Sequence, residues 1–462
     1  MSITRRDALK SLGALAGAAT ASRILPACGA DTEYPATIVV MMMENRSFDH
    51  FFGSRKLVEG KGSDGLVAGM KNPNRLGVDV GIWPATEDTL CVIDPPHGWD
   101  AARVQLAGGA CTGFLQAHQD DHNSDTAIEP MQYLLREHVP VSYALADAYT
   151  ICDRWFCSVL GPTWPNRYYW HTGTSDGITA NKLPSSGGIT WPSIYDRLNA
   201  AGVEWMYYYG DFPVVAADTD LDKTGRIKRF EDFADDAKAG KLAPVVYIDP
   251  AFSLNDDHPP HYPMLGQQLI ASVYSALASS PQWSKSLMVV TYDENGGFFD
   301  HVAPGKTADE RAAEGFDQLG FRVPGMLAGP YVKQGYVSSV SYDHTSVLKH
   351  IENTFALEPL TMRDAAAVDL SDCLDLDRMA KGQASKPIQL PAVMVDESML
   401  PDRCFNSGSA AAGLIHHDVL AWADANQALI GKYDRRGNLG DYVRSIDAML
   451  RRANAGGIRW GR

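Results

Sequence analysis

The hydrophobic pattern of this chain consists of short apolar runs separated by clusters of glycine and proline. Runs without polar interruption predict buried strands, whereas apolar residues at a spacing of three and four predict amphipathic helices. The strongest predicted strands are residues 37–43, 287–292 and 323–327, with weaker ones at 203–209 and 244–248, and helical patterns lie at 191–200 and 264–279. Strands that alternate with helices predict an α/β fold, with a central mostly parallel sheet and helices on both faces.

The character of the chain changes after about residue 365. An amphipathic stretch at 411–453, broken near 431–440, predicts a mostly helical C-terminal cap. We therefore expect a catalytic domain at residues 28–365 and an extension at 366–462 that packs on the same domain.

The first 27 residues resemble an export signal. Arg5-Arg6 stands directly before the apolar, alanine-rich stretch 12–21, a pattern typical of twin-arginine (Tat) signal peptides, although an ordinary amphipathic helix is the alternative. The segment Leu25-Pro26-Ala27-Cys28 resembles a bacterial lipobox. We expect export to the periplasm, the cell envelope or the medium, with membrane contact through a lipid anchor on Cys28.

Six cysteines follow Cys28, and an even number in an exported protein favours disulfides. Six cysteines allow fifteen connectivities, and the alternative is six buried thiols. Pairing by proximity in the sequence would join Cys91 to Cys111, Cys152 to Cys157 and Cys373 to Cys404.

Composition narrows the classes of function. A content of 45% hydrophobic and 21% charged residues is typical of a globular protein, and no apolar run is long enough to span a bilayer. The net charge of −15 disfavours nucleic acid as a partner, since the phosphate backbone would be repelled. Zwitterionic or small phosphorylated substrates fit this charge better, and the sequence indicates no protein partner.

Acidic and amide side chains follow the two strongest predicted strands. Glu44-Asn45 comes directly after residues 37–43, and Asp293-Glu294 comes directly after 287–292. The carboxyl ends of parallel strands meet at one edge of a sheet, and carboxylate and amide oxygens are the donors that hard divalent cations prefer. Each pair alone could cap a helix or bind arginine, but together they predict a metal site.

Thr163 lies between two prolines in the segment GPTWPNR (161–167). A hydroxyl becomes a nucleophile when a metal or a base lowers its pKa, and a helix start offers backbone N–H groups to a phosphate. The alternative is that Thr163 is simply a helix N-cap.

Three histidines in polar loops are candidates for phosphate binding or for protonation of a leaving group. They are His97, His258 and His301, each beside aspartate or proline. A single loop histidine is more often a local hydrogen-bond partner.

Four segments, in order, closely resemble motifs of the bacterial phospholipase C and acid phosphatase family, which includes plant non-specific phospholipases C. They are MENRSFDHFFG (43–53), GPTWPNR (161–167), DHPP (257–260) and YDENGGFFDHV (292–302). The resemblance implies an alkaline-phosphatase-like fold with one divalent ion, which could be Ca, Zn, Mn or Fe. It implies metal ligands Glu44, Asn45, Thr163, Asp293 and Glu294, catalytic Thr163, His258 and His301, and substrate-binding His97, Asn166 and Asp257.

The resemblance implies a metal-dependent phospholipase C that releases phosphocholine through a phosphothreonine intermediate. The alternatives are an acid phosphatase acting on monoesters and a non-catalytic surface protein that only binds a divalent ion. A choline cage would need aromatic faces, and the candidates, which could equally be core, are Trp99, Trp155, Trp164, Tyr168, Tyr169 and Trp170. A further family-like segment, residues 343–346, predicts a helix start whose His344 packs beneath the site.

Overall fold

The structure is a computed structural model that describes residues 34–218, 221, 224–393, 395, 404 and 418–455. The predicted signal peptide and Cys28 lie outside the described residues, as does the part of the predicted C-terminal cap at 411–417.

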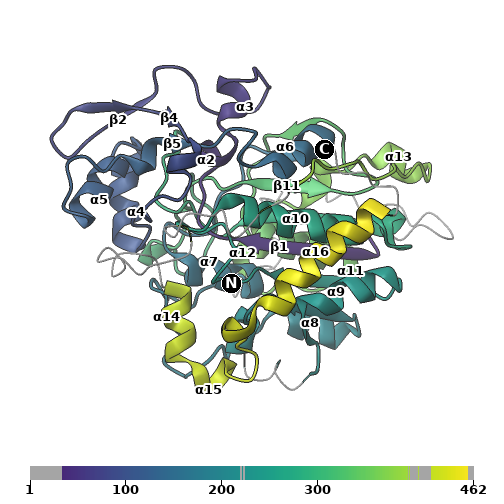
Figure 1. Cartoon of the computed structure of the whole chain (residues 1–462). Helices are drawn as coiled ribbons and strands as arrows, with labels where there is room; N and C mark the ends of the chain where they lie inside the picture. Colours follow the sequence, from purple (N-terminus) through teal and green to yellow (C-terminus); the bar gives the residue numbers. More distant parts are fainter. Residues whose placement is uncertain are drawn as a thin grey trace, which may run out of the picture. The chain divides into compact units, whose positions relative to one another are not determined.

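An eight-stranded sheet forms the centre of the fold (Figure 1). Its order is β12 (Tyr336–Ser338), β6 (Thr150–Cys152), β11 (Gly325–Ala328), β10 (Ser286–Tyr292), β1 (Thr37–Met43), β9 (Val245–Asp249), β7 (Trp205–Tyr209) and β8 (Ile227–Arg229). Every strand runs in the same direction except β11, which is antiparallel to β10 and β6. The predicted mostly parallel sheet is confirmed, and the strand predicted at 323–327 begins two residues later and is the reversed one.

Strand β1 is at the middle of the sheet, and all seven of its residues are buried. Its neighbours β9 and β10 are equally apolar and run parallel to it, as expected for strands covered on both faces. Met43 pairs with Tyr292 at the last position of the β1–β10 register. The residues that follow these two strands are therefore placed side by side.

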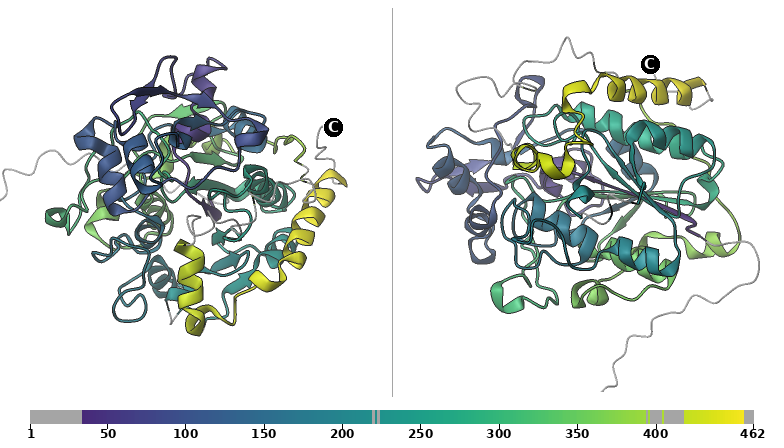
Figure 2. Two further views of the ribbon diagram at one scale, coloured as in Figure 1. Left: turned by 60° about the vertical axis from the view of Figure 1, so that its left-hand side comes forward. Right: turned by 90° about the horizontal axis from the view of Figure 1, so that it is seen from below.

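Helices cover both faces of the sheet (Figure 2). Helix α10 contacts both α6 and α9 on one side, and α7, α8, α11 and α12 form a connected group on the other. Their bounds are α6 Pro140–Ala148, α7 Thr163–Thr172, α8 Ile194–Ala201, α9 Phe230–Lys238, α10 Pro263–Ala278, α11 Thr345–Phe355 and α12 Met362–Ala366. Two of these, α8 and α10, correspond to the helices predicted from the sequence.

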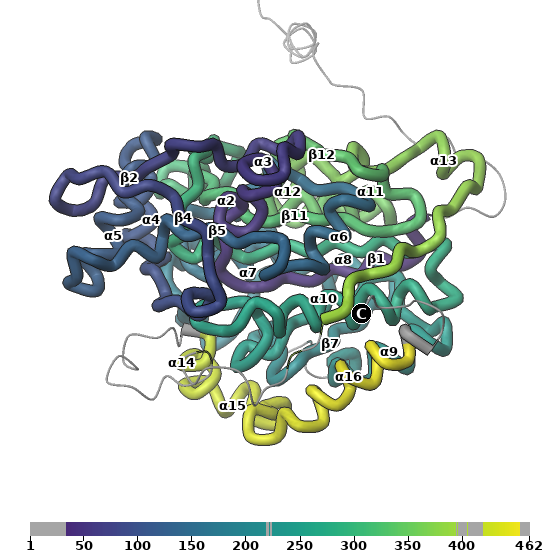
Figure 3. The backbone as a smooth tube through the Cα atoms, turned by 45° about the horizontal axis from the view of Figure 1, so that its top comes forward, coloured from purple at the N-terminus to yellow at the C-terminus, as the bar shows by residue number. Residues whose placement is uncertain are grey.

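Residues 48–133 form a lobe of short helices and small sheets at one side of the main sheet (Figures 1 and 3). It contains α2 (Phe48–Phe52), α3 (Ser54–Leu57), α4 (Trp99–Leu106), α5 (Phe114–Asp121) and the strand pairs β2–β3 (Lys71–Pro73, Asp79–Gly81) and β4–β5 (Trp83–Pro84, Gln132–Tyr133). A separate apolar cluster around Phe114, Leu115 and Phe321 supports this lobe. The hydrophobic pattern did not predict it, because its elements are too short to show a period.

The described C-terminal part contains the helices α13 (Leu376–Ala380), α14 (Asp418–Ala425), α15 (Gln427–Ile430) and α16 (Gly440–Ala455), and residues 383–393 have no regular structure. Helix α16 packs on α9 and α10. Its buried Tyr442 accepts a hydrogen bond from Asn255 Nδ2 (3.0 Å). In the described part of the chain, we find no helix of the length and hydrophobicity needed to cross a membrane.

The cysteine pairing predicted from sequence proximity is wrong. Cys91 is bonded to Cys404, 313 residues away, with a Cα–Cα distance of 5.3 Å. Cys111, Cys152, Cys157 and Cys373 are buried free thiols, and the Sγ atoms of Cys152 and Cys373 lie 3.8 Å apart. Pairing depends on which distant segments the fold brings together, and the sequence does not contain that information in local form.

Candidate active site

The two predicted acidic pairs meet at the carboxyl edge of the sheet. Glu44 and Asn45 follow β1, Asp293 and Glu294 follow β10, and all four side chains are buried. The Asp293 N–H donates to the Met43 carbonyl (3.1 Å), and the Asn45 N–H donates to Asp293 Oδ1 (3.1 Å). The two strand ends are thus joined through their backbones, and the Asn45 N–H also fixes the Asp293 carboxylate.

The backbone at this junction is closely packed and unusual. Asn45 has a φ of 55°, a left-handed conformation that is uncommon outside glycine. Gly296 has a φ of 61°, and a Cβ there would lie 2.2 Å from the Asn45 carbonyl oxygen. Only glycine allows the loop after Glu294 to approach the strand end so closely.

Thr163 lies at the same edge of the sheet, at the start of helix α7. It is the first residue of α7, is fully buried, and its Oγ1 donates to Asn45 Oδ1 at 3.5 Å. The helix N-cap is Pro162, so the alternative interpretation of Thr163 as the N-cap is wrong. The hydroxyl instead faces the acidic strand ends.

Asn166 holds the turn that precedes Thr163. Its Oδ1 accepts from the Val159 N–H (2.9 Å), and its Nδ2 lies within 3.3 Å of the carbonyls of Val159, Gly161 and Pro162. The Asn166 side-chain amide is thus bonded to the backbone of the loop before α7. Its predicted contact with substrate stays a prediction.

Arg167, one residue further along α7, is the main cation among the acids. Its guanidinium lies 3.0 Å from Glu44, 3.4 Å from Asp293 and 3.4 Å from Asp249, all buried. Sequence reasoning missed Arg167 and Asp249. Asp249 ends β9, so the rule that selected Glu44 and Asp293 could also have selected it, and a cluster of buried acids requires a nearby cation.

Burial dominates the electrostatics of the acidic site. It raises the pKa of Glu44 well above its ordinary value, the charge of Asp293 adds to this, and Arg167 opposes it. Burial also raises the pKa of Glu294 well above its ordinary value, against the opposing effect of His97 and with a further rise from Asp293. Ionising these carboxyls requires more positive charge than Arg167 supplies.

His97 and His258 converge near the acids together with Asp94. His97 Nδ1 bonds the Pro95 carbonyl (2.8 Å), which leaves Nε2 facing Asn45 Nδ2 (3.3 Å) and Glu294 Oε1 (3.9 Å). His258 Nδ1 bonds the Pro259 carbonyl (2.5 Å), and its Nε2 lies 3.9 Å from Asp94 Oδ2. Ligand atoms of Asp94, His97 and His258 all lie within 4.8 Å of one another. These nitrogens can bind a phosphate oxygen or a cation.

Asp257 adjoins this group but is already hydrogen-bonded. Its Oδ2 accepts from the Tyr292 hydroxyl (2.5 Å), and its carbonyl accepts from Arg46 Nε (2.8 Å). Burial raises the pKa of Asp257 to about 7, although the Tyr292 hydrogen bond and Arg46 oppose the rise. Its predicted role in substrate binding stays a prediction.

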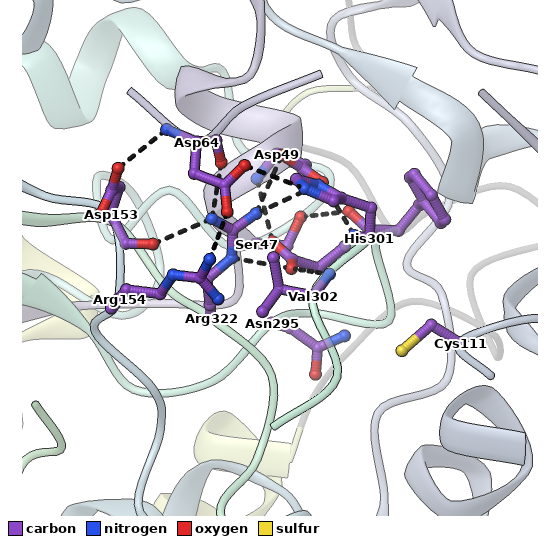
Figure 4. Close-up of polar contacts among 12 residues, drawn as sticks. Ser47, Asp49, Asp64, Cys111, Asp153, Arg154, Asn295, His301, Val302 and Arg322 are labelled. Carbon is purple, nitrogen blue, oxygen red and sulfur yellow. Dashed lines mark hydrogen bonds and ion pairs between the residues drawn. The ribbon is translucent and has the colours of Figure 1, made fainter. Parts of the chain in front are cut away.

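His301 lies with a different set of residues (Figure 4). Its Nδ1 is 2.6 Å from Asp49 Oδ2 and its Nε2 is 3.3 Å from Asp64 Oδ1, with Arg322 as the third polar partner. Burial lowers the pKa of His301, but the Asp49 hydrogen bond and charge outweigh this effect and raise it. The structure does not join His301 to Thr163 through any contact described here, and its role in catalysis stays a prediction.

His344 packs beneath the site, as predicted. Its Nε2 donates to the Asp293 carbonyl (2.7 Å), and its Nδ1 accepts from Trp155 Nε1 (3.4 Å). Burial lowers the pKa of His344 to about 4, so the ring is neutral at pH 7. It supports the position of Asp293 from below.

The aromatic residues near the site are mostly core. Among the six cage candidates only Trp99 is partly exposed, and the others are buried: Trp155, Trp164, Tyr168, Tyr169 and Trp170. Trp164, for example, stacks on Trp422 at 4.1 Å between ring centroids. Trp99 contacts the Arg103 guanidinium at 3.6 Å and borders Gly161. Burial excludes a cage built from all six rings.

Oxygen donors of the kind that hard divalent cations prefer gather at this edge of the sheet, from Glu44, Asn45, Thr163, Asp293 and Glu294. Asp293 Oδ2 and Glu294 Oε1 are buried and accept no hydrogen bond among the described residues, and their charged neighbours are Arg167 Nε at 3.4 Å and His97 Nε2 at 3.9 Å. Buried anionic oxygens of this kind are stabilised by a bound cation.

Comparisons with known proteins agree with the motifs. Residues 36–358 match the Phosphoesterase family. Non-specific phospholipase C6 of Arabidopsis thaliana is 32% identical, with 77% of this chain and 75% of that protein covered. Phospholipase C A of Mycobacterium tuberculosis is 30% identical, with 73% and 76% covered. A solved protein of the alkaline phosphatase superfamily from Vibrio parahaemolyticus is 13% identical, with 87% and 90% covered and a TM-score of 0.38.

Proposed function

Since this chain belongs to the phosphoesterase family, we propose that it is a metal-dependent phospholipase C that releases a phosphorylated headgroup from phospholipids. The observation that carries the proposal is the meeting of Glu44, Asn45, Asp293 and Glu294 with Thr163 at one buried edge of the sheet. The named relatives support the phosphodiester substrate.

In this proposal one divalent ion would be held by Glu44, Asn45, Thr163, Asp293 and Glu294. Its positive charge would lower the pKa of the Thr163 hydroxyl. Asn45 orients that hydroxyl, since its Oδ1 is the acceptor at 3.5 Å. Asn166 and the two flanking prolines keep the turn rigid, so that Thr163 approaches phosphorus in one direction.

A histidine Nε2 takes the proton of the Thr163 hydroxyl as its oxygen attacks phosphorus, and passes it to the departing diacylglycerol oxygen. The headgroup phosphate stays on Thr163 as a phosphothreonine diester. Water then displaces Thr163 and releases phosphocholine. His97 and His258, each held through Nδ1 by a backbone carbonyl, present Nε2 to the phosphate or to the departing oxygen. Charge stabilisation of the equatorial oxygens supplies most of the rate gain in such reactions.

The second candidate is an acid phosphatase acting on phosphomonoesters, because every group named above would serve that reaction equally. Five of the six aromatic residues that could form a choline cage are buried. This burial favours the acid phosphatase over a choline-specific enzyme whose cage would use those rings. The partly exposed Trp99, next to Gly161, is the remaining aromatic candidate for a choline contact.

Hydrolysis of p-nitrophenylphosphocholine and p-nitrophenyl phosphate, measured side by side before and after chelation, tests this proposal. We expect kcat/KM to be higher for the diester, and both activities to disappear when elemental analysis shows that the metal has been removed. A preference for the monoester would support the acid phosphatase. Full activity in metal-free protein would refute the metal-dependent mechanism.

We further propose that residues 1–27 direct Tat export and that Cys28 carries a lipid anchor. An enzyme held at a membrane surface would meet its phospholipid substrate at high local concentration. Replacement of Arg5-Arg6 by Lys-Lys should leave the protein in the cytoplasm, and Cys28→Ser should release it from the membrane fraction.

A further inference from the structure

Arg322 is a fully buried arginine outside the acidic site (Figure 4). It connects the segment that follows Glu44-Asn45 to the segment that follows Asp293-Glu294. Its Nε donates to Asp300 Oδ1 (2.9 Å), and its Nη2 donates to Asp49 Oδ1 (3.1 Å). Its Nη1 donates to the carbonyls of Asp64 (2.7 Å) and Asp153 (2.9 Å). Two carboxylates and two carbonyls thus surround one guanidinium.

The two carboxylates stand close in sequence to the proposed metal ligands. Asp49 is on α2, the helix that begins shortly after Glu44-Asn45, and Asp300 ends the loop that begins at Asp293-Glu294. The two segments are also joined directly, since the Asp49 N–H donates to Asp300 Oδ2 (3.3 Å). Neither segment can move without disturbing the other.

His301 and Ser47 add hydrogen bonds between the segment that contains Asp49 and the segment that contains Asp300. The His301 N–H donates to Asp49 Oδ2 (2.8 Å), and its ring bonds the same oxygen. Ser47 Oγ donates to the Phe299 carbonyl (2.7 Å). His301, placed by sequence reasoning among the catalytic residues, therefore belongs to the connection between the two segments.

We propose that Arg322, acting through Asp49 and Asp300, is a positioning residue that sets the geometry of Glu44-Asn45 relative to Asp293-Glu294 and so determines metal affinity. This inference rests on the proposed function. Residues that hold the segments carrying metal ligands tune metal affinity, because ligands lose alignment when their supports are removed. Lysine cannot replace the arginine here, because one ammonium cannot reach four acceptors in a fork geometry.

The test compares metal binding by the full chain carrying Arg322→Lys with that of the wild type. Chelator-stripped protein is titrated calorimetrically with Mn²⁺, Zn²⁺ and Ca²⁺ separately, and the thermal midpoint is recorded without metal. We expect the Kd of the bound metal to rise roughly 10- to 100-fold. We also expect kcat to be low at limiting metal and to recover at saturating metal, with KM nearly unchanged.

Arg435→Lys is the matched control. Arg435 is also buried, and its guanidinium joins two distant segments by pairing with Glu231 (3.0 and 2.5 Å) and the Gly210 carbonyl (3.3 Å). Its replacement should lower the thermal midpoint without changing metal affinity. If Arg322→Lys does not fold, Asp300→Asn removes one arm of the connection with almost no change in shape and is expected to raise the Kd in the same way.

The outcomes separate this inference from the proposed function. Wild-type protein that binds none of the three metals, or Glu44→Gln protein that binds as wild type does, would refute the proposed metal site. Loss of binding in Glu44→Gln together with wild-type affinity in folded Arg322→Lys, or in folded Asp300→Asn, would overturn the positioning role alone.

Discussion

Replacing Arg167 with methionine removes the cation shared by three buried acids while keeping an unbranched apolar stem of about the reach of the arginine Nε. Burial favours the neutral form of Glu44 in the metal-free protein, so its 3.0 Å contact with Arg167 counts as a hydrogen bond from a charged donor and not as a full ion pair. The other two contacts are evaluated at an effective dielectric constant of about 20. The contacts of 3.4 Å with Asp293 and Asp249 correspond to about 4.9 kcal/mol each. Desolvation offsets most of this sum, and loss of one member of a buried ion pair typically costs about 3–5 kcal/mol.

We therefore expect the free energy of unfolding of metal-free Arg167→Met protein to be about 3–5 kcal/mol lower than that of the wild type. Urea unfolding at pH 7 in the presence of chelator measures it. Arg167→Lys keeps the positive charge but not the several N–H donors of the guanidinium, so it should lower the free energy of unfolding by less than Arg167→Met does. Arg451→Met, at an exposed pair with Asp447, should show no measurable change. If Arg167→Met is as stable as the wild type, the acids are not ionised around this arginine and the electrostatic account fails.

Two further predictions concern stability away from the site. Cys91→Ser opens a loop of 313 residues, and the chain-entropy argument gives a loss of up to roughly 6 kcal/mol in the free energy of unfolding. Dithiothreitol should therefore lower the thermal midpoint of the wild type but not that of the variant. Burial and the neighbouring Asp364 raise the pKa of Glu352 from 4.5 to about 9. A raised folded-state pKa gives stability that is complete below the unfolded pKa and is lost as the pH rises through the folded pKa. Glu352→Gln should therefore gain stability over the wild type by up to about 1.4 kcal/mol per pH unit between about pH 5 and 9, and a pH-independent difference in urea unfolding would refute this.

The sequence allowed the centre of the fold and the acidic pairs to be predicted for one physical reason. Strands β1 and β10 are buried on both faces, so they appear as uninterrupted apolar runs, and parallel neighbours must end at the same edge. That rule placed Glu44 beside Asp293 without any knowledge of the intervening chain. Thr163 required the family resemblance, because its local sequence resembles a helix start.

Features that depend on long-range packing could not be predicted in this way. The reversed direction of β11 depends on how the chain returns from β10, and the Cys91–Cys404 bond joins two residues that are 313 positions apart. The pattern of Asp-His at 300–301 predicts a polar loop but not its partners. Arg322, which is one of the partners of both residues, has no local signature that distinguishes it from a surface arginine.

In the proposed mechanism, Thr163 attacks phosphorus with the help of a metal held by the acidic strand ends. Rapid acid quenching during turnover of p-nitrophenylphosphocholine, followed by mass spectrometry of the peptide that contains Thr163, would trap the covalent intermediate. We expect a phosphocholine group on Thr163 in the wild type, and loss of both this group and turnover in Thr163→Ala protein that still binds metal. Wild-type turnover by Thr163→Ala, or a phosphocholine group on a different residue, would contradict it.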